Sequence, residues 1–315
     1  MKNSTPITVT SRSFSRHPTL RSELLEQYSN VTFNDEGKKL VDNDLIDFLK
    51  GKEKAITALE KLDETVFAQL PDLKVISKYG VGIDMIDLAA MRRHGVLFGW
   101  TKGVNCRSVS ELVVSFAITI LRHVPIANRE VLSGQWRQHV GRQLSQRTVG
   151  IVGCGFVGKD LAILLRAFGC RVLAYDIKDF PEFFQQYGVE PASLETVLTT
   201  ADIVTLHLPL LDSTKNMLSA ARLSMLRSEA ILINTSRGGL VDEGALKSML
   251  MDGRLAAAAF DVFGVEPPDD LELLNLSNFL VTPHIGGSAE EAILAMGRAA
   301  IKGLDSAVEP DPEMY

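Results

Sequence analysis

A glycine-rich segment, VGIVGCGFVG at residues 149–158, constrains the fold of this chain more than any other feature. It places Gly153, Gly155 and Gly158 between an apolar run typical of a buried strand and an amphipathic segment typical of a helix. In such a unit the first glycine permits a tight turn, the second lets a pyrophosphate approach the backbone, and the third lets helix and strand pack closely. The segment therefore predicts a nucleotide-binding β–α–β unit.

The residues after this segment continue the alternation of strands and helices. Apolar runs such as RVLAYD, DIVTLHLP and AILINTS are separated by amphipathic helical segments, one of which runs from Asp242 to Gly253. A parallel sheet that is covered on both faces requires near-continuous apolar strands of this kind. Residues 1 to about 100 alternate more loosely, with ITVTSRSF as a strand and TLRSELLEQY as a helix. Since a domain averages ~150 residues, a chain of 315 residues is expected to form two domains. Because strands and helices alternate in both parts, we expect an α/β protein with two doubly wound parallel-sheet domains.

An acidic residue follows the glycine loop at the distance that a dinucleotide site requires. The next strand ends near Asp176, 18 residues past Gly158, where a carboxylate can accept both hydroxyls of an adenosine ribose. The same charge repels a 2′-phosphate, so we expect NAD rather than NADP, although Lys178 could soften this discrimination. The predicted cofactor site also includes Phe156, Val157 and Ile177.

Polar side chains follow the later strands of the predicted sheet. Because the carboxyl ends of parallel strands meet at one edge, these side chains are expected together. They are His207, Thr235, Ser236, Arg237, Asp261, Glu266 and His284. Arginine can grip a carboxylate with two hydrogen bonds, histidine can move a hydroxyl proton, and glutamate can fix the histidine tautomer and favour imidazolium. Taken singly, Arg237 could be an ion pair, Glu266 an exposed loop acid and His284 a turn residue.

The segment NCRSVSELVVSFAITILRHVP predicts one long buried helix. Ser108 and Glu111 have the spacing of a capping box, the body is apolar on nearly all sides, and Pro125 is expected to stop the helix.

Charge and cysteine usage argue against several classes of protein. A net charge of −6 favours neither nucleic acid nor an anionic membrane as a partner. The N-terminal residues lack an apolar stretch of signal-peptide length, and residues 112–121 are too few to span a bilayer, so a cytoplasmic location is expected. Cys106, Cys154 and Cys170 lack metal-site spacing, and no histidine forms an i, i+4 pair with a carboxylate, so we expect no metal.

The polar constellation resembles a known family. Arg237 in NTSRGGLVDEGAL, Glu266 in FDVFGVEPP and His284 in TPHIGG are similar to the catalytic arginine, glutamate and histidine of the D-isomer-specific 2-hydroxyacid dehydrogenases, especially their phosphoglycerate dehydrogenase-like branch. Their separations of 29 and 18 residues also match. The resemblance covers nearly the whole chain. It implies a Rossmann NAD-binding domain at 102–285, inserted into a flavodoxin-like substrate domain formed by 1–101 and a returning helix at 286–315. It also implies a homodimer.

Further roles follow from the resemblance. Backbone donors for a substrate carboxylate are expected in Tyr79, Gly80, Val81 and Gly82, with Asn105 beside the substrate. His207, Pro209 and Thr235 are expected to contact the nicotinamide half, and Asp261 to hold its carboxamide. Thr214, Ser236, Gly286 and Gly287 complete the expected cofactor positions. Two departures from the family, Lys78 and Lys102, indicate a substrate with a second anion such as phosphate, unless both lysines are merely solvated.

The resemblance implies an NAD-dependent oxidoreductase that interconverts a small D-2-hydroxy acid and its 2-keto acid, for example 3-phosphoglycerate. Two other functions stay open. One is an NADH-sensing corepressor that keeps the catalytic set but binds peptides. The other is a dehydrogenase of phosphite or a phosphonate.

Overall fold

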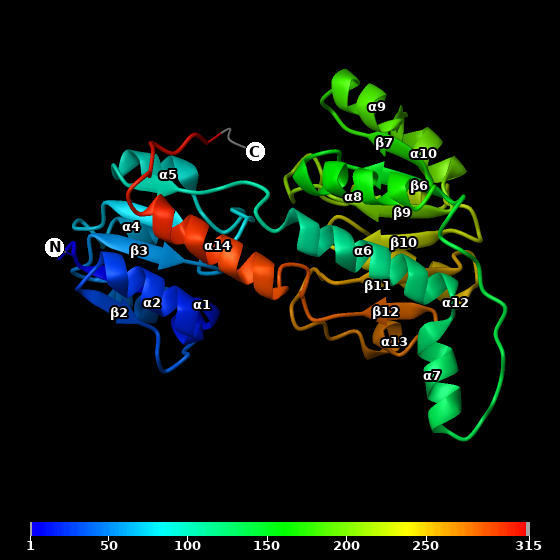
Figure 1. The fold of residues 1–315 in the computed structure, drawn as a ribbon, viewed down its shortest axis with the longest axis horizontal. Coiled ribbons are helices and arrows are strands. Elements are labelled where there is room, and N and C mark those ends of the chain that lie inside the picture. The colour runs from blue at the N-terminus through cyan, green and yellow to red at the C-terminus, as the bar shows by residue number, and fades with distance from the viewer. Residues whose placement is uncertain (1, 313–315) are drawn as a thin grey trace. The chain divides into compact units, whose positions relative to one another are not determined.

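The computed structural model describes residues 2–312, and the chain divides into two compact units (Figure 1). Unit 1 comprises the residues up to Asn105 together with those from Ala289 onward, and unit 2 is the continuous segment Cys106–Ser288. A continuous unit is therefore inserted into a discontinuous one.

In the described part of unit 1, five parallel strands form one sheet in the order β2-β1-β3-β4-β5. This is the flavodoxin-like order expected for a doubly wound domain. The strands are β1 (Ile7–Val9), β2 (Val31–Phe33), β3 (Lys54–Thr57), β4 (Val75–Lys78) and β5 (Leu97–Gly99). The helices are α1 (Arg12–Arg16), α2 (Pro18–Gln27), α3 (Asp42–Leu49), α4 (Glu64–Phe67), α5 (Leu88–Arg93) and α14 (Glu290–Gly303).

The first predicted strand is only half correct. ITVTSRSF forms β1 at its start, but the Ser11 side chain accepts the Phe14 N–H and begins α1 instead of continuing the strand. A serine that can bond a backbone N–H three residues ahead favours a helix start over a ladder. The helix predicted at TLRSELLEQY is confirmed as α2, which has Pro18 in its first turn.

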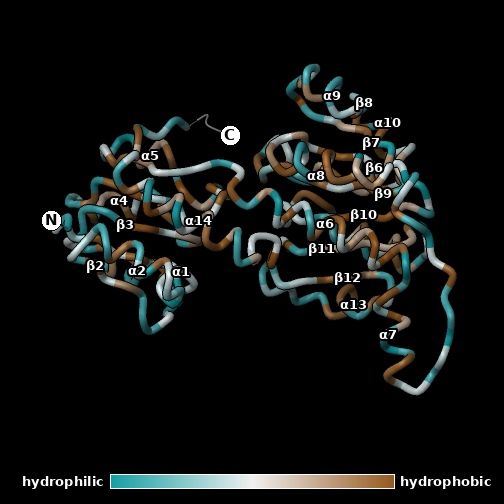
Figure 2. Tube along the Cα trace, in the orientation of Figure 1, coloured by the Kyte–Doolittle hydropathy of each residue, from teal (hydrophilic) through white to brown (hydrophobic). Residues whose placement is uncertain are grey.

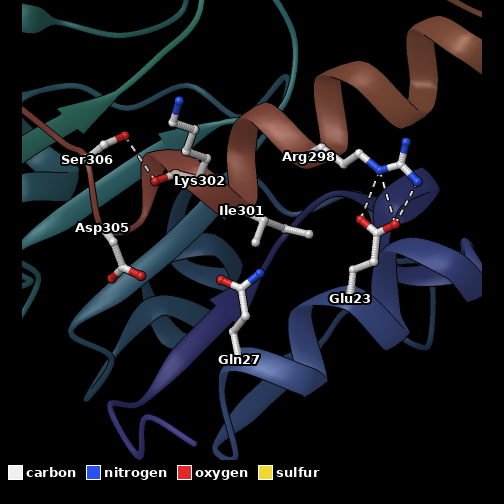
Figure 3. A pocket seen from close by; sticks show the side chains of 7 residues that line it. All are labelled: Glu23, Gln27, Arg298, Ile301, Lys302, Asp305 and Ser306. Carbon is white, nitrogen blue, oxygen red and sulfur yellow. Dashed lines mark hydrogen bonds and ion pairs between the residues drawn. The ribbon is translucent and has the colours of Figure 1, made fainter.

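Helix α14 completes the core of unit 1 although it is distant in sequence. Ser77 Oγ donates to the Ala300 carbonyl at 2.6 Å, and a Cβ on Gly99 would lie 2.3 Å from the Gly303 carbonyl oxygen, so the helix backbone lies directly on the sheet. Its apolar face joins the buried cluster around β1 and α2. On the outer side, Arg298 pairs with Glu23 of α2 at 2.7 Å beside a surface hollow of about 390 Å³ (Figure 3).

Unit 2, described in full, holds seven parallel strands in the order β12-β11-β10-β9-β6-β7-β8. Its central part is the dinucleotide-binding order with one added edge strand, as expected for a Rossmann domain. The strands are β6 (Thr148–Val152), β7 (Arg171–Tyr175), β8 (Glu190–Pro191), β9 (Ile203–Leu206), β10 (Ile231–Asn234), β11 (Ala257–Phe260) and β12 (Phe279–Val281). The helices are α6 (Cys106–Leu121), α7 (Val124–Leu132), α8 (Phe156–Ala167), α9 (Pro181–Tyr187), α10 (Leu194–Thr200), α11 (Ala220–Leu223), α12 (Glu243–Met251) and α13 (Leu271–Leu274).

The apolar strands of unit 2 are buried on both faces of its sheet. Along β10, Ile231 and Ile233 join one core cluster and Leu232 joins the other, because successive side chains point to opposite faces. The strands accordingly colour as mostly hydrophobic in Figure 2. This explains why the sequence shows continuous apolar runs there rather than alternation.

The long apolar helix begins and ends differently from the sequence expectation. α6 already includes Ser108, whose Oγ donates to the Gly286 carbonyl at 2.6 Å, so the predicted capping box is wrong. The helix ends before His123, which has a left-handed φ of 55°, and Pro125 opens α7 instead of stopping α6. Among residues 2–312, no single helix has the length and apolar character of a membrane span. Only α6 and α7 taken together have that length and apolar character, and this pair is bent by 60°.

Candidate active site

Three neighbouring strands of unit 2 carry the arginine, the glutamate and the histidine. β10, β11 and β12 pair in parallel, so their carboxyl ends lie along one edge of the sheet. Arg237 follows β10, Glu266 follows β11 and His284 follows β12. The topology therefore delivers all three segments to the edge where doubly wound sheets bind ligands.

Two of the three side chains are in direct contact. Nδ1 of His284 lies 2.9 Å from Oε2 of Glu266, and Oε1 of Glu266 accepts the Phe263 N–H at 3.1 Å. The glutamate is thus anchored by the backbone while it orients the ring. Both side chains keep about two fifths of their surface exposed, at 43% for His284 and 40% for Glu266. With Nδ1 engaged, Nε2 is the ring nitrogen left to exchange a proton with a ligand.

The turn that carries His284 is held by a buried carboxylate. His284 has a left-handed φ of 55° and donates its N–H to the Asp261 carbonyl at 2.9 Å. The Asp261 side chain accepts from Thr282 Oγ1 at 2.5 Å, from the Ile285 N–H at 2.7 Å and from the Gly286 N–H at 2.7 Å. Asp261 is only 1% exposed. The resemblance assigned this residue to the nicotinamide carboxamide, and the structure adds this use of its oxygens within the turn.

A buried amide shapes the turn that carries Arg237. Asn234 Oδ1 accepts from the Ser236 N–H and hydroxyl, and Nδ2 donates to the Arg237 carbonyl at 2.8 Å. One guanidinium nitrogen of Arg237 donates to the Ser236 carbonyl at 2.7 Å. We did not single out Asn234 from the sequence, although an Asn at the end of a strand is a known signal for a side-chain-stabilised turn.

Gly238 allows the turn that carries Arg237 to pack directly against the segment after β11. A Cβ at this position would lie 1.9 Å from the carbonyl atoms of Phe263 and 2.3 Å from the Gly264 nitrogen. Glu243 Oε1 accepts the Gly264 N–H at 2.9 Å and joins the same two segments. The segments bearing Arg237 and Glu266 are therefore packed backbone to backbone, a contact that only glycine allows.

The glycine loop has the geometry that its spacing predicts. Gly153 has a φ of 98°, and a Cβ on Gly158 would lie 2.2 Å from the Gly153 carbonyl oxygen. A Cβ on Gly155 would meet no atom within 4 Å, and no side chain caps the α8 N-terminus that follows it. The first residues of this helix are Phe156 and Val157. Its uncapped N–H groups offer a site for an anion such as a pyrophosphate.

Asp176 is fixed by the backbone at the end of β7. Its Oδ2 accepts the Cys154 N–H of the glycine loop at 2.6 Å, and its Oδ1 accepts the Lys178 N–H at 2.8 Å. Next to it, Ile177 is 88% exposed, and Phe156 of the loop is 59% exposed. An oriented carboxylate with exposed apolar neighbours is a suitable surface for a ribose and the base attached to it.

The expected nicotinamide-side residues follow β9 and β10. His207 lies next to Thr205, with Nε2 3.0 Å from its Oγ1, and burial of the ring lowers the pKa of His207 to about 3, so the ring is neutral at pH 7. Thr235 Oγ1 is buried and has no hydrogen-bond partner among residues 2–312. By contrast, the Thr214 hydroxyl donates to the Pro209 carbonyl at 2.6 Å and shapes its own loop. Of these residues, Thr235 offers the polar atom that most needs a ligand.

These observations fit a bound dinucleotide. The glycine loop leaves open space at Gly155, the α8 N-terminus lacks a cap, Asp176 is oriented, and Thr235 presents an unpaired buried hydroxyl. Gly286, also expected at the cofactor, is buried, and both its N–H and its carbonyl are engaged within unit 2, whereas no hydrogen bond of Gly287 occurs among residues 2–312. No group of three or more metal-ligating side chains is placed to hold an ion in the part of the chain described.

The expected substrate loop of unit 1 follows β4. The N–H of Tyr79 donates to the Thr57 carbonyl at 2.8 Å, so the expectation that Tyr79 supplies a backbone donor is wrong. Within residues 2–312, the N–H groups of Gly80, Val81 and Gly82 donate no hydrogen bond. The Val81 carbonyl accepts from Trp100 Nε1 at 3.0 Å, which fixes the loop, and Asn105 is the last residue of this stretch of unit 1.

The two unusual lysines differ in their surroundings. Lys78 is 3% exposed and its ammonium donates to the Ala58 carbonyl, so the alternative of a solvated lysine is wrong for this residue. Lys102 is exposed, and its Nζ lies 5.1 Å from the centre of the Trp100 ring.

Comparison with known proteins places the chain in a family. Residues 114–286, more than half of the chain, match the model of the D-isomer specific 2-hydroxyacid dehydrogenase, NAD binding domain. The chain is 37% identical over 241 residues to the D-3-phosphoglycerate dehydrogenase of Bacillus subtilis, covering 76% of this chain and 46% of that enzyme. It is 36% identical over 282 residues to the glycerate dehydrogenase of Methylorubrum extorquens, covering 86% and 87%. The chain therefore spans about half the length of the first relative and most of the second.

A solved structure gives the same result. The D-lactate dehydrogenase from Aquifex aeolicus, complexed with NAD and lactic acid, superposes with a TM-score of 0.83 at 25% identity, covering 95% of this chain and 94% of that one. The match to the family model also assigns residues 114–286 to binding NAD. The protein belongs to the D-isomer specific 2-hydroxyacid dehydrogenases, a family of NAD-dependent oxidoreductases.

Proposed function

We propose that the protein interconverts a small D-2-hydroxy acid and its 2-keto acid, with Arg237, Glu266 and His284 as the catalytic residues. The observation that carries the proposal is the contact of 2.9 Å between His284 Nδ1 and Glu266 Oε2 at the strand edge that also carries Arg237 and the glycine loop. Bound NAD would supply the hydride acceptor, or NADH the donor, and the protein would supply binding and proton transfer.

Each catalytic residue has a separate task in this proposal. The Arg237 guanidinium binds the substrate carboxylate and polarises the adjacent carbonyl oxygen. His284 Nε2 removes the hydroxyl proton in one direction and returns it in the other, while Glu266 holds the ring and stabilises its protonated form. Glu266 is suited to this because its second oxygen accepts the Phe263 N–H at 3.1 Å, which restrains the carboxylate.

Backbone donors of unit 1 are proposed to bind an anionic group of a ligand. Gly80, Val81 and Gly82 supply N–H groups that have no acceptor within residues 2–312. Because Lys78 is buried and Lys102 is exposed, Lys102 is the more accessible of the two departures to a second anionic group. The curated relatives are named for phosphoglycerate, glycerate and glyoxylate, so the test uses both phosphorylated and unphosphorylated acids.

The test is the oxidation of NADH or NADPH with a panel of 2-keto acids, using the wild type, His284→Ala and Arg237→Ala. We expect turnover with NADH on at least one keto acid, and a loss on the order of 10²- to 10⁴-fold in His284→Ala. His94→Ala is the matched control, because His94 forms a similar pair with Glu64, Nε2 to Oε1 2.7 Å, in unit 1. Full turnover by His284→Ala, or no turnover by the wild type on any keto acid, would refute the proposal.

The two remaining functions need two further measurements: reduction of NAD with phosphite or a 2-hydroxy acid, and binding of NADH. Oxidation of phosphite with NAD, without oxidation of any 2-hydroxy acid, would identify the protein as a phosphite dehydrogenase. NADH binding without turnover of any acid would favour the NADH-sensing corepressor.

A homodimer is part of the proposal. Leu132 at the end of α7 is 79% exposed, and Trp136 and Val140 in the segment after it are 85% and 95% exposed. Large apolar side chains exposed so close together in sequence are suited to contact with a second copy of the chain.

A further inference from the structure

The sheet of unit 1 has a crevice that the proposed function does not use. A doubly wound sheet binds ligands outside the carboxyl ends of its strands, at the point where neighbouring connections leave to opposite faces. Successive residues of β3, Ala55 and Ile56, belong to different core clusters, so these clusters lie on the two faces of the sheet. Helix α2, which follows β1, packs into the cluster of Ile56, and α4, which follows β3, packs into that of Ala55. The crevice of this sheet therefore lies between β1 and β3, which pair in parallel.

A hollow of about 760 Å³ opens at this crevice. Its lining comes from within residues 11–16, 38–46 and 58–66, the segments that follow β1, β2 and β3. Sites for small molecules have volumes of ~300–1,000 Å³, so the hollow has the size of a metabolite site. None of Arg237, Glu266 and His284 lines it. Its apolar lining includes four side chains that are at most 7% exposed: Leu40, Leu45, Ile46 and Val66.

The charge of the hollow is opposite to that of the whole chain. Five cationic and three anionic side chains line it, whereas the chain carries a net charge of −6. Lys38 pairs with Glu36 at 2.5 Å, and Lys61 pairs with Asp63 at 2.9 Å. The Glu60 carboxylate accepts a backbone N–H within its own turn at 2.6 Å. Because the walls of a cleft focus the field of the charges that line it, a positive hollow attracts anions.

Three of the five cations have no partner among residues 2–312. Arg12, Arg16 and Lys39 form neither an ion pair nor a side-chain hydrogen bond within this part of the chain. The Arg16 guanidinium lies against the turn after β2, because Gly37 has a φ of 66° and a Cβ there would lie 2.2 Å from Nη2 of Arg16. The third anion of the lining, Asp42, is the first residue of α3, where a carboxylate interacts with the N–H groups of the helix. Two guanidinium groups and one ammonium group are therefore available to an anion.

We propose that this hollow binds a phosphate monoester of metabolite size. A phosphate carries a charge of about −1.5 to −2 at pH 7 and three acceptor oxygens, and guanidinium groups bind it with paired hydrogen bonds. Arg12, Arg16 and Lys39 are the groups that hold the phosphate, and Leu40 and Ile46 contact the carbon skeleton. Because all of these residues belong to unit 1 and none is a proposed catalytic residue, the site is independent of the proposed function.

Calorimetric titration with glycerol 3-phosphate tests this site. The probe has a phosphate but no carboxylate, and glycerol is its uncharged counterpart. The protein is saturated with NAD, so that the probe cannot bind where the pyrophosphate of the cofactor belongs. We expect a Kd of about 1 mM or tighter for glycerol 3-phosphate and no heat of binding with glycerol. The same Kd is expected for Arg237→Ala, because Arg237 lies outside the hollow.

Two double variants locate the anion. Arg12→Gln combined with Arg16→Gln is expected to raise the Kd by about tenfold or more, because hydrogen bonds between charged groups are lost. Both arginines are exposed, so this variant is expected to fold. Arg92→Gln combined with Arg93→Gln is the matched control, since it removes the same charge from unit 1 at the end of α5, where each arginine is paired with a carboxylate. The control is expected to change the Kd by less than about twofold, because salt screens the loss of charge alone.

The ¹⁵N resonances of the arginine Nε atoms give a second, independent measurement. The resonances that are absent from the Arg12 and Arg16 double variant are expected to shift when glycerol 3-phosphate is added to the wild type. Those that are absent from the control variant are expected to stay in place.

The outcomes are distinguishable. The inference would be overturned if glycerol 3-phosphate shows no saturable binding, or if both double variants raise the Kd equally. Loss of binding in Arg237→Ala would also overturn it, because the anion would then belong to the proposed active site. Saturable binding that only the Arg12 and Arg16 double variant weakens would support the inference. If a protein with this binding reduces no keto acid, the inference stands and the proposed function is refuted.

Discussion

His207 should make the folded protein sensitive to mild acid. It follows β9 in unit 2, with Nε2 3.0 Å from Thr205 Oγ1, and burial lowers the pKa of its ring to about 3. An unfolded histidine has a pKa of about 6.5. The unfolded chain therefore binds a proton at pH values where the folded protein does not. Stability contributed by the neutral ring is complete above about pH 6.5 and is lost progressively as the pH falls toward 3.

The size of the effect follows from these two values. Between pH 7 and pH 5, protonation of the unfolded state at this one site costs about 2 kcal/mol of the free energy of unfolding. His207→Gln removes the titration while keeping a polar end near Thr205. We expect the variant to be less stable than the wild type at pH 7, because its packing is altered, but to lose about 2 kcal/mol less between pH 7 and pH 5.

Urea unfolding of the wild type and the variant at pH 7 and pH 5 measures the free energy of unfolding. The value to compare is that of the transition in which unit 2 unfolds. A histidine-labelled NMR titration checks the cause, because the His207 resonance should not move between pH 8 and pH 5. Equal pH dependence of stability in the two proteins, or a His207 resonance that titrates near pH 6.5, would refute the reasoning.

Three further predictions concern the glycine contact, the cofactor and the assembly. Gly238→Ala places a Cβ 1.9 Å from the Phe263 carbonyl, so we expect a lower Tm and at least a tenfold loss of keto-acid reduction; a variant with the wild-type Tm and activity would contradict this contact. Asp176→Ser removes the charge that repels a 2′-phosphate, so the kcat/KM ratio of NADPH to NADH should rise by about tenfold, roughly 1.4 kcal/mol, and an unchanged ratio would show that Asp176 does not set the preference. Trp136→Asp puts a charge on a side chain that is 85% exposed, and sedimentation should then show monomers in place of the dimer proposed for the wild type; identical sedimentation would exclude this surface as the interface.

The local units of the fold could be predicted because each depends on residues close in sequence. The glycine loop, α8 and β7 follow from turn geometry and periodicity alone, and they have the arrangement expected of them. The edge of the sheet that carries Arg237, Glu266 and His284 was also predictable, because parallel strands must end together.

Contacts between distant segments could not be predicted in this way. Ser108 has the spacing of a cap, but it bonds to Gly286, which is 178 residues away. From the sequence, Lys78 is expected to be a surface cation. In the structure its ammonium is buried against the carbonyl of Ala58, which follows the neighbouring strand β3. Asp261 has three side-chain bonds to residues at least 21 positions away, and only the fold brings these partners together.

The late position of α14 in the chain has a consequence for synthesis on the ribosome. The sheet of unit 1 is built from residues 7–99, but its core includes Met296, Ala300 and Ile301, which emerge only after all of Cys106–Ser288. The inserted unit can fold as soon as it leaves the exit tunnel, whereas the host sheet must wait with part of one apolar face uncovered. That waiting interval is when a nascent chain of this design most needs a chaperone, and a pause in translation before Glu290 would lengthen it.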